Sequence, residues 1–281
     1  MLSKAIPLAL ATAITGSMAA SASPPDIVFL CDEMPDICTN MCWAIRCANP
    51  HFSYQLTLDF PSKLERSKRL KSTQCSRCPP QPPVPYSMSS IITNSSMVCN
   101  AYPFPDTSES AASNGTLVTR CVPEEQQIDQ ELEISMLATR FSGSGGKQTV
   151  SIGFGNPGAP GVRYCLSEPC ENDGWEEQGK NKMEQKKPKM KQKKPKTVQK
   201  RAVAAPFRIF ETKSGMAIAS MEDLTAGRNI TRRVAAKEKL SPLADTWHEA
   251  LDGKQHAFVR DSIVREMKDA EIRDKAGRWL R

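Results

Sequence analysis

Cysteines are the residues of this 281-residue chain with the most obvious chemistry, and all ten lie in its first 170 residues. An even number of cysteines in an exported chain favours disulfides, because an oxidising compartment pairs thiols. The Cys-x-x-Cys spacing at residues 75–78 also fits a zinc knuckle or a redox pair, but here we interpret it as two half-cystines at a tight turn. We predict five bridges, with their pairing left open, among Cys31, Cys38, Cys42, Cys47, Cys75, Cys78, Cys99, Cys121, Cys165 and Cys170.

The N-terminus predicts export. Residues 1–22 contain Lys4, then an apolar stretch, then a small-x-small Ala-Ser-Ala cleavage site, which is typical of a signal peptide. The apolar stretch is shorter than the roughly 20 residues that span a bilayer, which argues against a membrane anchor, and no later stretch is long enough for one. We therefore predict an extracellular, glycosylated protein without a membrane span, with acceptor triplets at Asn94, Asn114 and Asn229.

Residues 24–175 combine the cysteines with patterned apolar residues, so we predict a small, disulfide-rich α+β domain there. In the helix expected over 35–46, Ile37 and Met41 supply an apolar side, and Cys38 and Cys42 share one face. Acidic residues crowd the first turn of a second helix, expected over 124–141. We expect strands at 27–30, 56–58, 117–122 and 149–154.

Basic residues gather in two places. A capping box, Ser62-x-x-Glu65, opens a short segment that ends near residue 71. Residues 180–201 hold eleven Lys or Arg and one Glu, against a net charge of +7 for the whole chain. Because this stretch cannot bury a core, we predict a disordered linker over 176–201. It is either a solvated spacer or an arm that binds DNA or another polyanion, since export argues against a nuclear signal.

Residues 202–281 form a charged tail that we predict to be partly helical. Val259, Ile263, Met267 and Ala270 make a narrow apolar stripe at helical spacing. We interpret His248 and His256 as surface residues, because no cysteine or matched spacing accompanies them. The tail is also the expected docking site for a partner protein. Three oppositely charged pairs have helical spacing: Asp261–Arg265, Asp269–Arg273 and Glu271–Lys275.

Three segments of the cysteine-rich region together resemble one protein family. They are Cys31-Asp-Glu-Met-Pro-Asp-Ile-Cys-Thr-Asn-Met-Cys-Trp-Ala-Ile-Arg-Cys47, Cys99-Asn-Ala-Tyr-Pro-Phe104 and Arg120-Cys-Val-Pro-Glu-Glu-Gln-Gln127, followed by Gln130. In this order they are similar to the cysteine-rich secreted branch of the NucA/NucB deoxyribonuclease domain. The resemblance implies a ββα-metal type fold and non-specific, metal-dependent cleavage of DNA, with Mg²⁺ or Mn²⁺ as cofactor.

This sequence departs from the family at its acidic positions. Asn100 and Ala101 stand where the family has Asp and Glu, and Gln126 and Gln127 stand where it usually has an acid and Asn. Amides do not titrate, so they cannot serve as general bases near neutral pH. Glu109 matches a family acid, although its alternative interpretation is a helix-surface carboxylate.

Two functions from different classes follow. The first is a secreted nuclease that hydrolyses DNA with Glu109, Gln126 and Asn100 nearest the metal, by resemblance. The second is a catalytically degenerate, cysteine-rich protein that binds a polyanion or a partner protein. Between Pro24 and Trp175 there are eleven basic and sixteen acidic side chains, which disfavours DNA unless the basic ones share a face. The candidate DNA-binding residues are Lys63, Arg66, Lys68, Arg69 and Lys71.

Overall fold

The computed structural model describes residues 26–71, 78, 96–113, 117–141, 146–174, 176–178, 206–234, 238, 240, 244–251, 254–272 and 275. Several expectations fall outside these residues: the signal peptide, the lysine-rich stretch 180–201, Cys75, and the acceptor sites at Asn94 and Asn114. Asn229 is described and exposed, and its glycosylation stays a prediction.

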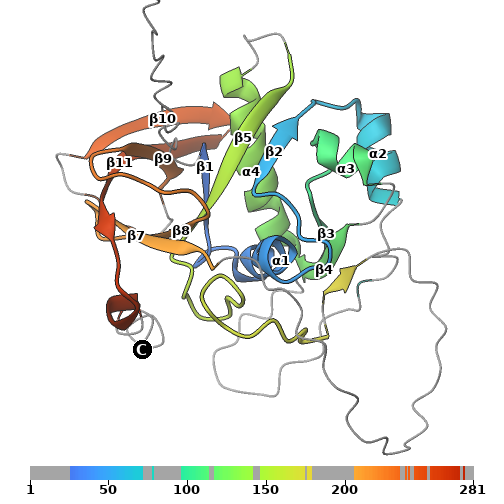
Figure 1. The fold of residues 1–281 in the computed structure, drawn as a ribbon. Helices are drawn as coiled ribbons and strands as arrows, with labels where there is room; N and C mark the ends of the chain where they lie inside the picture. Colours follow the sequence, from blue (N-terminus) through green and yellow to red (C-terminus); the bar gives the residue numbers. More distant parts are fainter. Residues whose placement is uncertain are drawn as a thin grey trace, which may run out of the picture.

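The fold is mixed α+β, as predicted (Figure 1). Its helices are α1 (Pro35–Arg46), α2 (Lys63–Lys71), α3 (Ser108–Ala112) and α4 (Glu124–Phe141). Its strands are β1 (Ile27–Leu30), β2 (Gln55–Leu58), β3 (Met97–Tyr102), β4 (Val118–Pro123), β5 (Gln148–Gly155), β6 (Glu177–Gln178), β7 (Arg208–Thr212), β8 (Ala217–Ser220), β9 (Asn229–Arg233), β10 (Asp245–Leu251) and β11 (Lys254–Glu266).

Two sheets organise these strands. An eight-stranded sheet runs β1-β5-β8-β7-β11-β10, with β2 also paired to β5 and β9 to β11. Because β9 comes back beside β1, this sheet is nearly closed into a barrel. A three-stranded sheet runs β3-β4-β6. Figure 1 shows the C-terminal strands on one side of β5 and α4, and α2 and α3 on the other.

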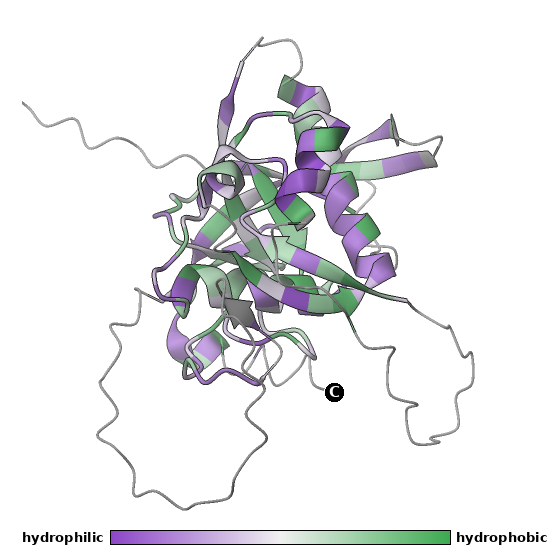
Figure 2. Ribbon diagram, turned by 90° about the vertical axis from the view of Figure 1, so that its right-hand side faces the viewer, coloured by the Kyte–Doolittle hydropathy of each residue, from purple (hydrophilic) through white to green (hydrophobic). Residues whose placement is uncertain are grey.

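Helix α1 is the centre of the core. Pro35 lies in its first turn, where the fixed φ of proline suits a helix start. Ile37, Met41 and Ile45 are 0%, 0% and 2% exposed, and α1 packs on β3, β4 and α4. Figure 2 shows the hydrophobic stretches gathered inside the molecule, with hydrophilic ones along the outer faces of the helices.

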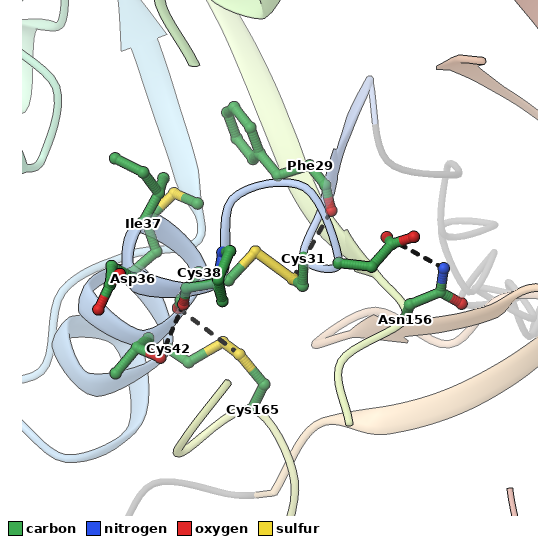
Figure 3. The surroundings of a disulfide bond; sticks show 12 residues. Phe29, Cys31, Asp36, Ile37, Cys38, Cys42, Asn156 and Cys165 are labelled. Carbon is green, nitrogen blue, oxygen red and sulfur yellow. Dashed lines mark hydrogen bonds between the residues drawn. A yellow bond between two sulfur atoms is a disulfide. The ribbon is translucent and has the colours of Figure 1, made fainter. Parts of the chain in front are cut away.

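Disulfides fasten α1 to its surroundings. Cys31–Cys38 joins the end of β1 to α1, and Cys42–Cys165 and Cys47–Cys170 join α1 to the chain beyond β5. Figure 3 shows the first two side by side, with Cys38 and Cys42 both on α1. The bridges from Cys42 and Cys47 each span a sequence separation of 123, and constraining so long a loop in the unfolded chain contributes about 4–5 kcal/mol by the chain-entropy argument.

The disulfide prediction is confirmed for the described cysteines. A fourth bridge joins Cys78 to Cys121 on β4, and Cys99 is also disulfide-bonded. Of the cysteines in the described ranges, none is a free thiol.

The tail differs from its predicted helical form. Its described part is mainly β-structure, and the expected apolar helix stripe lies largely on strand β11. Val259 and Ile263 are 3% and 1% exposed in that strand, while within the described part of the tail helical residues occur only at 269–272 and at 275. The expected Asp261–Arg265 pair is replaced, because Arg265 bonds Glu211 at 2.9 Å and Glu271 at 2.8 Å.

The tail also shares the core of the cysteine-rich region. β8 pairs with β5 through Phe154↔Ala219 and Gly155↔Ile218. On the other side, Phe258 of β11 packs against Leu132 and Met136 of α4. The predicted linker over 176–201 includes β6, which pairs with β4, and the structure does not describe residues 179–201. In the ranges that the structure covers, no helix has both the length and the apolarity to cross a bilayer.

Candidate functional site

Asn100 lies in a buried network of side-chain amides. It is 1% exposed on β3, and its Oδ1 accepts a hydrogen bond of 2.7 Å from Nδ2 of Asn40. Its own Nδ2 donates to Oε1 of Gln127 at 2.9 Å and to Oε1 of Gln130 at 2.6 Å. These four side chains are neutral at every accessible pH. The position at which the resemblance leads us to expect an aspartate is therefore occupied by an asparagine in a network of uncharged hydrogen bonds.

The fold explains why these amides meet. β3 and β4 pair with Asn100 opposite Arg120, and α4 begins directly after β4. Gln127 and Gln130 are three residues apart, so they lie on one face of α4 and point towards β3. Asn40 comes from α1, which packs against the same sheet.

A cleft of about 260 Å³ opens beside this network. Asn100, Gln127 and Gln130 line it, together with an ion cluster centred on Arg66. The guanidinium of Arg66 bonds Asp106 at 3.1 Å and Glu131 at 2.8 Å. The carboxylates nearest the amides are thus already paired with a cation.

These donors do not fit a divalent metal ion. Mg²⁺ and Mn²⁺ prefer several carboxylate or water oxygens. Here Oδ1 of Asn100 accepts from Asn40, Asp106 and Glu131 face Arg66, and the third carboxylate of the cleft, Glu124, accepts from the hydroxyl of Ser96. Within the described part of the chain, no group of three His, Cys, Asp or Glu is arranged to hold a metal. Around Asn100, this cleft offers hydrogen bonding by neutral amides.

Gln126 lies apart from the cleft and caps α1. Its Oε1 accepts from the backbone N–H of Asp36 at 2.9 Å and of Ile37 at 3.4 Å, and its Nε2 donates to Oδ2 of Asp36 at 3.1 Å. The first N–H groups of a helix have no partner inside it, so this side chain satisfies two of them. The geometry gives Gln126 a structural role.

Glu109 also bonds the backbone. Its Oε2 accepts from the N–H of Thr57 at 2.9 Å, next to a bridge between Leu58 and Thr107. This carboxylate fixes α3 against β2, and it does not line the cleft. Of the three candidate catalytic residues, the structure brings only Asn100 to the cleft.

The basic residues of α2 divide into two groups. Arg66 and Arg69 are partly buried in ion pairs. Arg69 bonds Asp59 at 2.8 Å and also donates to the carbonyl of Pro105, so its guanidinium faces the protein. Lys63 and Lys68 are exposed. The side chain of Lys71 lies outside the description. Only the exposed lysines can offer their charge to a polyanion without breaking an existing pair.

Two buried arginines are each surrounded by three carboxylates. No sequence motif indicated either cluster. Arg120 bonds Asp36, Asp173 and Glu176, at 3.2, 3.3 and 2.6 Å. Burial raises the pKa of Glu176 to about 7. The predicted linker therefore begins with a residue of the core.

The second cluster joins the tail to α4. Arg233 of β9 bonds Glu33 at 2.7 Å, Asp129 at 3.5 Å and Glu133 at 3.0 Å. Burial raises the pKa of Glu133 to about 7, because one guanidinium is shared among three carboxylates and Glu133 is the most deeply buried. These contacts could be found only from the tertiary structure, since the four residues are up to 200 positions apart.

Comparison with known families bears directly on this geometry. Residues 41–151 match the family model described as Deoxyribonuclease NucA/NucB. The expected family resemblance is confirmed. The match covers Asn100, Gln127 and Gln130, and it begins one residue after Asn40. No curated protein and no solved structure matches the chain. We refer to the cysteine-rich region as the NucA/NucB-like domain.

Proposed function

We propose that this is an exported protein whose NucA/NucB-like domain binds DNA without hydrolysing it. The observation that carries the proposal is the hydrogen bonding of Asn100, whose amide satisfies Asn40, Gln127 and Gln130 at once. An amide in this network neither takes a proton from water nor supplies the negative charge that a divalent ion requires.

The chemical argument is one of missing charge. Hydrolysis of a phosphodiester needs a base to activate water and a cation to stabilise the developing charge. Of the three carboxylates that the structure describes in the lining of the cleft, Asp106 and Glu131 are bound to Arg66, and Glu124 accepts a hydrogen bond from Ser96. Loss of a general base alone lowers a rate by about 10²–10⁴-fold. Metal-assisted cleavage by Glu109, Gln126 and Asn100 is therefore the less favoured function.

DNA binding rests on the family and on charge outside the cleft. Residues 41–151 match a family described as deoxyribonucleases, and this makes DNA the polyanion that we propose. Lys63 and Lys68 are exposed on α2, and residues 180–201 carry a net charge of +10 by sequence, from eleven basic residues and one acidic residue. Such lysines bind phosphates through the release of counterions.

Export is part of the same proposal. The described cysteines are paired in cystines, which persist in oxidising compartments. The signal-type N-terminus agrees with that route.

The test pairs binding with cleavage on the oxidised full chain. Fluorescence anisotropy with labelled duplex DNA should give an affinity that falls with salt, with a log–log slope of about −0.9 for each phosphate contacted. A variant with Lys193, Lys194 and Lys196 changed to Gln should show a shallower slope. An affinity independent of salt, or equal slopes for the two proteins, would overturn the electrostatic part of the proposal.

Reversal of the substituted position tests the catalytic part. The variant Asn100→Asp with Ala101→Glu restores the family's acidic pair, and Asn100→Ala is its matched control. The proposal predicts chelator-sensitive cleavage in the acidic variant that exceeds the wild-type level by at least tenfold, if loss of these acids is what silenced the site. Equal, chelator-sensitive cleavage by wild type and both variants would contradict it.

A further inference from the structure

A second hollow runs along the exposed face of α4, next to the amide cleft. It has a volume of about 620 Å³ and is bounded by β2, α2 and His256 of β11. Ile128, Glu131, Ser135 and Ala138 line it from α4 at the three- and four-residue spacing of one helix face. We call this hollow the α4 groove.

The α4 groove exposes apolar side chains. Ile128 is 60% exposed and Phe60, which also lines the groove, is 43% exposed. Among the described residues, only two further large apolar side chains are as exposed, Leu64 and Val264. Half of this exposed apolar set therefore lies in one concavity, whose floor is the buried Leu132. Contiguous exposed apolar surface with a polar rim marks an interaction site.

The rim of the α4 groove is acidic. Asp106, Asp129 and Glu131 line it, and Arg66 is the only arginine or lysine among its lining residues. That arginine is bound to Asp106 and Glu131. Asp129 bonds Arg233, which is not among the lining residues, at 3.5 Å. Three carboxylates against one arginine leave the lining with a negative net charge, which favours cationic groups over the phosphates of DNA.

We propose that the α4 groove binds a basic segment of a partner protein, with apolar side chains that insert beside Ile128 and Phe60. Charge complementarity selects the basic segment, and the exposed apolar pair selects apolar anchors within it. Asn100 and the exposed lysines of α2 do not line this groove, although it shares with the amide cleft the residues Arg66, Asp106, Ile128, Glu131 and Ile134.

The test uses three short synthetic peptides as probes. One combines lysine with leucine at helical spacing, one replaces each leucine by glutamine, and one replaces each lysine by glutamate. Titration calorimetry with the oxidised full chain should detect binding of the first. We expect at least tenfold weaker binding of the second, which lacks apolar anchors, and of the third, which has the wrong charge.

Two variants locate the binding. Ile128→Lys adds a positive charge and removes an apolar contact inside the groove, and it should weaken binding of the first peptide by about tenfold or more. Val264→Lys makes the same change at a residue that is 47% exposed on β11 and is not among the groove residues. It should leave the affinity unchanged.

Three results would overturn the proposal: equal effects of the two variants, equal binding of the lysine–leucine and lysine–glutamine peptides, or preference for the acidic peptide. Loss of peptide binding in Ile128→Lys with unaltered DNA affinity would separate this surface from the DNA-binding function.

Discussion

The ion cluster of Arg233 makes a quantitative prediction about stability and pH. Glu133 is 3% exposed and shares one guanidinium with Glu33 and Asp129. Replacing it by glutamine keeps an oxygen that can accept from Nε of Arg233, and it removes the buried negative charge. The variant Glu133→Gln therefore isolates the effect of ionising this one carboxyl group.

The magnitude follows from the pKa. Burial raises the pKa of Glu133 from 4.5 to about 7, so between these values the folded protein binds a proton that the unfolded chain releases. The free energy of unfolding must then decrease as pH rises across this window, and the stabilisation is fully present only below the unfolded pKa. At 1.36 kcal/mol per pH unit, ionisation of Glu133 lowers the free energy of unfolding by about 3 kcal/mol across this pH window.

Urea denaturation of the oxidised proteins at a series of pH values measures the effect. The difference in unfolding free energy, Glu133→Gln minus wild type, should shift in favour of the variant by about 3 kcal/mol between pH about 5 and pH about 8. The contribution of Glu176 cancels in this difference. Glu131→Gln, at a side chain that is 45% exposed, is the matched control, and the shift measured for Glu133→Gln should exceed the one measured for this variant. A difference that stays constant with pH would refute the reasoning.

Four further predictions concern Asn100, the cap of α1 and the basic residues of α2. Asn100→Ala removes three buried hydrogen bonds and should lower the unfolding free energy by about 2–4 kcal/mol in urea denaturation, whereas a loss below about 0.5 kcal/mol would contradict the network. Gln126→Ala should cost about 1–2 kcal/mol through the lost cap of α1, with DNA affinity unchanged. A changed affinity would instead place Gln126 at the DNA. Changing Lys63 and Lys68 to Gln should make the salt slope of DNA binding shallower by about 0.9 for each lost phosphate contact, at unchanged stability. Arg69→Gln should lower the unfolding free energy and leave the salt slope unchanged, because the charge of Arg69 is held by an ion pair with Asp59.

Local signals predicted the helices of the NucA/NucB-like domain well. The expected helices over 35–46 and 124–141 agree with α1 and α4, since proline, acidic residues in the first turn and apolar spacing all act within a few residues. The capping box is also present, with Glu65 accepting from the N–H of Ser62 at 3.0 Å.

The tail shows why periodicity alone fails. Val259, Ile263 and Met267 are four residues apart, and this interval returns to the same side of both a helix and a strand. In a strand, the residue midway between Val259 and Ile263 lies on the same face as they do, and an apolar residue there would have distinguished the strand from a helix. That position holds Asp261, which is 6% exposed and lies near Arg232. Pairing of β11 with β7 and β9 decides in favour of the strand, and such long-range pairing is not encoded in a short window.

The site was predictable only in part for a similar reason. The resemblance directed attention to Asn100, which does line the cleft. The resemblance assigned the place on α4 nearest the metal to Gln126. Successive helix residues are about 100° apart, so neighbours along α4 face different parts of the molecule. The neighbour Gln127 and, one turn on, Gln130 face Asn100 instead, while Gln126 faces α1. The position of the Glu109 carboxylate depends on how α3 packs against β2, and the sequence around Glu109 does not specify that packing.

Nicking of supercoiled plasmid by the oxidised, full-length wild-type protein tests the central claim most directly. With Mg²⁺ or Mn²⁺ present, the account predicts that the plasmid stays supercoiled at protein concentrations that saturate DNA binding. Nicking that a chelator abolishes, and that Asn100→Ala also abolishes, would show that a neutral amide at this position supports hydrolysis, and the account would be wrong.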